Sequence, residues 1–121
     1  MSVPSRILFE RYIIILRLIQ PARIQDIINM HNTIFNITEE ERISRLIKKI
    51  HDNMKREQRI IQVRRGTYIL DAASMNIASR LVKERNLDNE RIFLMKRQRK
   101  RYVKNARRLG LSAESASQNS R

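Results

Sequence analysis

An apolar repeat between residues 39 and 57 constrains the fold of this chain more than any other feature. Apolar side chains recur there at intervals of three and four residues, which places them on one face of an α-helix. Thr38 precedes three glutamates, an arrangement that caps a helix and suits its positive amino end. The sequence therefore predicts a helix over residues 39–57 with one buried face. The residues of that face are Ile43, Leu46, Ile47, Ile50 and Met54.

A β-hairpin is predicted directly after this helix. Apolar residues in 60–63 and 68–70 flank the corner Arg64-Arg65-Gly66. Gly66 supplies the positive φ that a short hairpin loop needs. We expect Tyr68 to pack into the core, and the two arginines to stand at an exposed turn.

Four further helices are predicted from the spacing of apolar residues. The isoleucine-rich first of them also suits a strand, and Pro21 ends it. Residues 111–121 lack a core-forming pattern and are expected to be a disordered tail. The four predicted helices are residues 5–19, 22–32, 72–85 and 88–109.

The net charge narrows the classes of partner. The 121 residues include 26 Lys and Arg against 12 Asp and Glu, which gives a net charge of +14. Such a surplus of positive charge indicates a polyanionic binding partner, most often nucleic acid and less often an anionic membrane. The longest apolar run, residues 12–19, is broken by Arg17 and is far shorter than the roughly 20 residues of a membrane span. We therefore expect an intracellular protein, cytoplasmic or nucleoid-associated, for which membrane binding is the weaker alternative.

Residues that carry enzyme chemistry are scarce. The chain has no cysteine, and its two histidines, His31 and His51, have no cluster of metal-ligating or catalytic partners around them in the sequence. Its two glycines, Gly66 and Gly110, form neither a nucleophile elbow nor a phosphate-binding loop. We expect a non-enzyme without metal or cofactor, with His51 at the boundary of the buried helix face.

The order of elements in residues 1–71 is helix, short helix, long amphipathic helix and hairpin. This is the order of a winged helix, so the predicted fold class is mainly α with a small β-hairpin and a C-terminal helical extension. Residues 39–57 would be the recognition helix, whose outward face enters the major groove, and residues 60–70 would be the wing. The predicted organisation is a DNA-binding domain at 1–71, a basic helical extension at 72–110 and a tail at 111–121.

The stretch 42–70 also resembles known families. It looks like the small winged-helix modules of the HARE type and the N-terminal winged-helix domain of Mrr-type restriction enzymes. The resemblance rests on a recognition helix that runs into a two-stranded wing with an Arg65-Gly66 corner and Tyr68 soon after. It implies DNA binding, and it implies no catalytic function.

Exposed cations on the predicted helix and wing are the first candidate DNA contacts. The alternative for the helix is a solvated face with the weak pairs Glu41–Arg45, Asp52–Lys48 and Asp52–Arg56. The alternative for the wing is an exposed turn that tolerates any polar residue. The candidate contacts are Arg45, Lys48, Lys49, Arg56, Arg64 and Arg65.

A block of basic residues between 96 and 108 is the second candidate contact, and it contains no acidic residue. It would track phosphates beside the winged helix. It also suits an arginine-rich RNA-binding helix, an amphipathic helix on anionic lipid, or a dimerisation helix. The block consists of Lys96, Arg97, Arg99, Lys100, Arg101, Lys104, Arg107 and Arg108.

These patterns favour a homodimeric winged-helix protein that binds double-stranded DNA, with transcriptional regulation as its role. One rival is a non-specific DNA or RNA binder in which the block 96–108 dominates. Another is a protein-interaction module whose basic helix binds an acidic partner or a membrane.

Overall fold

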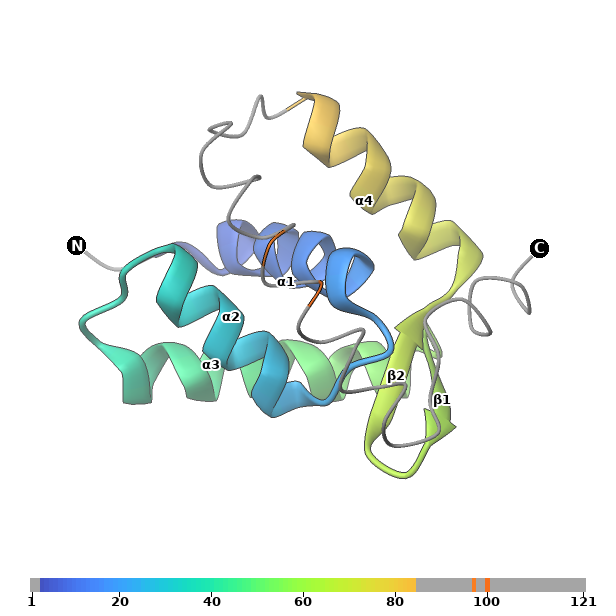
Figure 1. Cartoon of the computed structure of the whole chain (residues 1–121), viewed down its shortest axis with the longest axis horizontal. Helices are drawn as coiled ribbons and strands as arrows, with labels where there is room; N and C mark the ends of the chain where they lie inside the picture. Colours follow the sequence, from blue (N-terminus) through green and yellow to red (C-terminus); the bar gives the residue numbers. More distant parts are fainter. Residues whose placement is uncertain (1–2, 85–96, 98–99, 101–121) are drawn as a thin grey trace.

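The computed structural model describes residues 3–84 together with Arg97 and Lys100. Within them the predicted order of helix, helix, helix and hairpin is confirmed, and a further helix follows (Figure 1). The fold is mainly α with one antiparallel hairpin, and this arrangement is compatible with a winged-helix layout. The elements are α1 (Ser5–Ile19), α2 (Ile24–Ile34), α3 (Glu40–Arg56), β1 (Ile60–Arg64), β2 (Thr67–Leu70) and α4 (Ala72–Glu84).

Helix α1 is the centre of the core. It packs against α2, α3 and α4, so apolar side chains are buried on more than one of its faces. This explains why its sequence carries a near-continuous apolar run, which alone does not distinguish a buried helix from a strand. Its buried apolar residues are Leu8, Tyr12, Ile13, Ile14, Ile15, Leu16 and Ile19.

Helix α2 begins at Ile24, two residues later than the sequence predicts. The reason is that Ala22 pairs with Tyr68 of β2 as an isolated antiparallel bridge. The Ala22 N–H donates to the Tyr68 carbonyl at 3.0 Å, and the Tyr68 N–H donates to the Ala22 carbonyl at 2.9 Å. Because these bonds hold Ala22 against the hairpin, the helix starts only after Arg23, whose N–H donates to Asp26 Oδ2 at 3.2 Å.

Helix α3 confirms the predicted phase but not the predicted cap. Ile43, Ile47 and Met54 are buried on its inner face. The N-cap residue is Glu39 rather than Thr38, and its side chain makes no capping hydrogen bond. Glutamates in the first turn suit the positive helix end, so charge takes the place of the expected cap.

The hairpin reverses at Gly66, which has the predicted positive φ, at 73°. Ile60 pairs with Leu70, and both are buried against the helices. The pairing shifts between Gln62 and Arg64, so the strand carries a bulge close to the turn. Ile61 and Val63 lie 50% and 40% exposed, so they do not join the core.

Helix α4 packs against α1 and completes the core. Asp71 Oδ1 accepts a hydrogen bond from the Ser74 N–H at 2.8 Å at the start of this helix. Ala78 and Leu81 are buried in the same apolar cluster as α1. The structure describes this helix as far as Glu84, and residue 85, where its end is predicted, lies outside the described residues. The helix predicted over 88–109 and the tail predicted over 111–121 lie outside the described residues, apart from Arg97 and Lys100.

Candidate nucleic-acid interface

The outer face of α3 presents exposed cations. Arg45, Lys48 and Lys49 are all exposed. In the part of the chain that the structure describes, none of these three forms an ion pair with a carboxylate. The surface pairs weighed from the sequence are therefore not formed there. Their charges remain available to an anion.

The acidic residues near this face are paired with other cations. Asp52 Oδ1 lies 3.5 Å from Lys55 Nζ, and Glu39 Oε2 lies 3.1 Å from Arg42 Nη1. These pairs are exposed and span three residues of one helix, so each contributes only a few tenths of a kcal/mol, roughly, to stability. The carboxylate in the middle of the face, which weakens the case for dense phosphate contacts, is thus partly neutralised.

Near the carboxyl end of α3, the predicted contact Arg56 lies beside two exposed cations that were not predicted as contacts. Arg56 Nη2 donates to Asn53 Oδ1 on the exposed side of the helix. Lys55 and Arg59 are exposed next to it, and Arg59 Nε lies 3.0 Å from Glu57 Oε2. The signal that could have found Lys55 and Arg59 is their position between the two predicted sites, where the chain passes from helix to wing.

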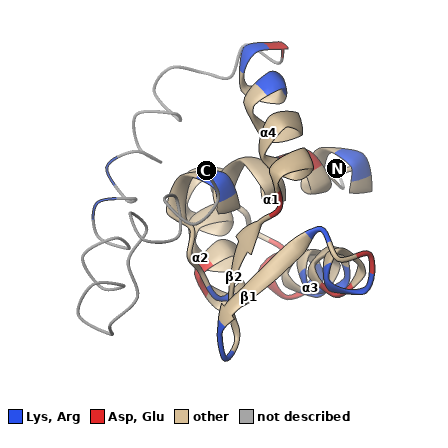
Figure 2. Ribbon diagram, turned by 90° about the vertical axis from the view of Figure 1, so that its right-hand side faces the viewer, with Lys and Arg blue, Asp and Glu red and all other residues tan. Residues whose placement is uncertain are grey.

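The turn of the hairpin lies on the same side of the molecule as α3. In Figures 1 and 2 both elements occupy the lower side, and α4 occupies the upper side. Arg64 and Arg65 at this turn are exposed. Figure 2 shows basic residues at the turn and along α3. The fold therefore places α3 and the turn, the two elements that carry the helix and wing cations predicted from sequence, on one side of the molecule.

The charge along α3 is polarised. The exposed glutamates Glu39, Glu40 and Glu41 stand at its amino end, which lies away from the hairpin (Figure 1). The cations from Arg45 onward lie toward the hairpin. A polyanion that contacts both α3 and the turn would therefore meet the basic part of the helix.

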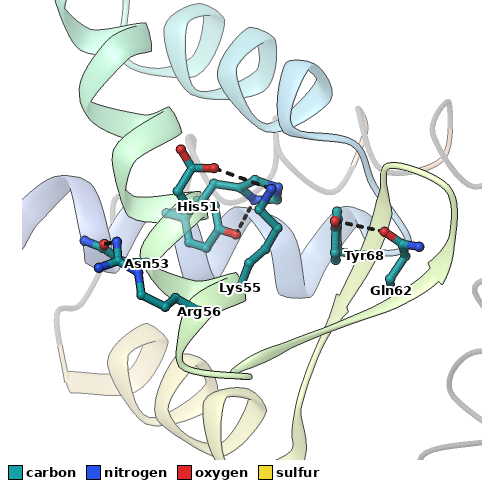
Figure 3. A network of polar contacts seen from close by, with 8 residues as sticks. His51, Asn53, Lys55, Arg56, Gln62 and Tyr68 are labelled. Atoms are coloured by element: carbon teal, nitrogen blue, oxygen red, sulfur yellow. Dashed lines mark hydrogen bonds and ion pairs between the residues drawn. The ribbon is translucent and has the colours of Figure 1, made fainter.

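A chain of side-chain contacts joins α3 to the hairpin beneath this surface (Figure 3). A hydrogen bond of 2.8 Å joins Tyr12 Oη of α1 to His51 Nδ1 of α3. The His51 ring meets the Tyr68 ring of β2 edge-on, with centroids 5.0 Å apart and planes at 84°. Tyr68 Oη then donates to Gln62 Oε1 of β1 at 3.0 Å.

The inner part of this chain is buried and uncharged. His51 is 4% exposed, so the expectation that it would be a boundary residue is wrong. Burial lowers the pKa of the His51 imidazole to about 4, with Lys55 adding to the fall and Asp52 opposing it. Burial also raises the pKa of the Tyr12 phenol above its usual value, with Tyr68 and Asp52 adding to the rise. At neutral pH the contact therefore joins two neutral groups.

The second histidine has a separate environment. His31 of α2 lies 1% exposed, and its Nε2 is 3.3 Å from Arg11 Nη1 of α1. Burial lowers the pKa of His31 to about 4, while its contact with Asn32 opposes this fall and Arg11 adds to it. The Arg11 guanidinium also stacks 3.8 Å above the centre of the Phe35 ring. This cluster joins α1 to the end of α2.

The C-terminal basic block falls almost wholly outside the described residues. Arg97 and Lys100 are described, and both are exposed. The remaining members, Lys96, Arg99, Arg101, Lys104, Arg107 and Arg108, stay candidate contacts from the sequence alone.

Comparison with known proteins gives no relative to guide the functional assignment. No protein-family model matches the chain, and neither a curated protein nor a solved structure is found to be similar to it. Over the residues that the structure describes, none of the helices combines the length and apolar character needed to cross a membrane. The same residues hold no group of three or more His, Asp or Glu side chains arranged to bind a metal ion.

Proposed function

We propose that this protein binds duplex DNA through α3 and the β1–β2 turn, as a winged-helix regulator of transcription. The observation that carries this proposal is that α3 lies on the same side of the molecule as the turn that carries Arg64 and Arg65. The exposed Arg45, Lys48 and Lys49 of α3 have no carboxylate partner among the described residues. A rigid helix and a hairpin that both carry exposed cations suit the groove and backbone of a duplex.

Binding would begin with neutralisation of phosphates and release of their counterions. The outer face of α3 would then lie in the major groove, with its basic part next to the backbone. Arg64 and Arg65 would contact phosphates beside the adjacent minor groove, since guanidinium groups bind phosphate oxygens in pairs. The basic block 96–108 would add further backbone contacts, and a homodimer would double this surface.

The direct test is binding of the full chain to a mixed-sequence DNA duplex, the matching RNA duplex and the single strands, each across a salt series. The proposal predicts a preference for the DNA duplex that persists as salt rises. Equal binding to all the nucleic acids, with a steep loss in salt, would contradict it. That result would favour a general polyanion binder driven by the block 96–108.

A further inference from the structure

The side chain of Gln62 is the outermost member of the contact chain described above. It lies exposed on β1, opposite Tyr68 in the hairpin register. Its carbonyl oxygen accepts the Tyr68 hydroxyl at 3.0 Å. Figure 3 shows the amide nitrogen on the side of the group away from Tyr68. Gln62 therefore presents two N–H donors to solvent.

Contacts with buried residues fix the orientation of the Gln62 amide. Tyr68 is restrained because its ring meets the edge of His51, and its backbone is tied to Ala22 by two hydrogen bonds. His51 is in turn bound to Tyr12, which is 1% exposed. Each contact fixes the next, so an exposed glutamine, which would otherwise rotate freely, is held in one orientation. Such restraint lowers the entropy lost when the amide binds a ligand.

The surroundings of the amide suit an anionic acceptor. Arg64 follows two residues later on the same strand, Arg65 comes next at the turn, and both are exposed. Hydrogen-bond donors on the strand that leads into this basic turn suit an oxygen that carries negative charge. Gln62 lies on β1, which connects the end of α3 to the turn, so a duplex that contacts both α3 and the turn would pass close to it.

We propose that Gln62 donates a hydrogen bond to a backbone phosphate of bound DNA, and that Tyr68 acts as a positioning residue for it. This inference rests on the proposed binding of duplex DNA. Tyr68 does not itself contact the phosphate. Its hydroxyl holds the Gln62 oxygen, so that the amide nitrogen faces outward.

The test measures binding of the full chain to a mixed-sequence DNA duplex for Gln62→Ala, Tyr68→Phe and the double variant. Asn76→Ala is the matched control, because Asn76 is an exposed amide on α4, on the opposite side of the molecule. Gln62→Ala is expected to weaken binding by about tenfold or more, the loss of one hydrogen bond to a charged group. Its salt dependence should stay that of the wild type, because the amide carries no charge.

The double variant separates positioning from simple structural damage. Tyr68→Phe should weaken binding by about 3-fold when Gln62 is present, and by nothing further in the Gln62→Ala background. A loss of equal size in both backgrounds would overturn the positioning role. Unchanged binding by Gln62→Ala would overturn the contact itself.

Two further outcomes distinguish failure of the Gln62 contact from failure of the proposed duplex binding. A loss that differs between A·T-rich and G·C-rich duplexes would overturn the phosphate assignment, because phosphates carry no base identity. Failure of the wild-type chain to bind any duplex would refute the proposed function instead, before any variant is compared.

Discussion

The ring of His51 stands edge-on to the ring of Tyr68, with their centroids 5.0 Å apart. This contact ties the middle of α3 to β2, so the helix and the hairpin are held at one angle. On the other side, His51 is hydrogen-bonded to Tyr12 of α1. The surface proposed to bind DNA is thus supported from the core by neutral groups.

The buried histidines make stability fall in acid. In the unfolded chain each protonates near pH 6.5, while burial lowers the folded pKa to about 4. Between these values the unfolded state binds more protons, so lowering the pH favours unfolding. The free energy of unfolding should fall with a slope approaching about 1.4 kcal/mol per pH unit for each histidine.

Chemical denaturation across pH 7 to 4 measures this slope. His51→Gln keeps a hydrogen-bonding side chain near Tyr12 but removes one titrating group, so its slope should be shallower than that of the wild type. The same slope in both proteins would show that His51 does not titrate as the buried contact requires.

The turn arginines are expected to act on binding and not on folding. Changing Arg64 and Arg65 to alanine should weaken duplex binding by about tenfold at moderate salt, because two charge-assisted phosphate contacts are lost. The melting temperature should not move, since both side chains are exposed. The matched control changes Arg80 and Lys83 to alanine on α4, on the opposite side. Equal losses in the two double variants would remove the turn from the mechanism.

The phase of α3 is tested by neighbouring substitutions. Ile47 is 1% exposed, and Lys48 beside it is exposed. Ile47→Asp should destabilise the fold by more than about 3 kcal/mol, because it buries a charge without a partner. Lys48→Asp should leave the melting curve nearly unchanged. Similar melting curves for the two variants would contradict the burial pattern.

The conformation of the turn depends on Gly66. Apart from its two neighbours in the chain, no other residue has an atom within 4 Å of the place that a Cβ would take here, so steric crowding is not the constraint. Its φ of +73° is the constraint, and Gly66→Ala should therefore cost about 1 kcal/mol of stability. Gly66→Asn should cost less, because asparagine tolerates this conformation better. Thermal unfolding in which alanine is the better tolerated of the two would argue against the left-handed turn.

Local patterns in the sequence were sufficient to predict the elements that carry the site. The spacing from Ile43 to Met54 defines the buried face of α3, and Gly66 marks the turn. Both signals act within a few residues, where helical periodicity and backbone sterics decide the outcome. The exposure of Arg45, Lys48 and Lys49 follows from the same phase.

Contacts between distant residues could not be read from those patterns. Tyr12 and His51 are 39 positions apart, and a histidine at the edge of an apolar face has the same local pattern whether or not it is buried. The bridge from Ala22 to Tyr68 is equally non-local, and it delays the start of α2. The restraint on Gln62 depends on both contacts. Whether α3 and the turn contact DNA stays a prediction.

The most direct measurement of the central claim is the salt dependence of duplex DNA binding after Arg45, Lys48 and Lys49 are changed to alanine together. If these three cations contact phosphates, the slope of log K against log salt should become shallower by about 3. The Arg80 and Lys83 variant of α4 should keep the wild-type slope. A wild-type slope in the α3 variant would contradict the account, because the exposed face of α3 would then lie away from the DNA.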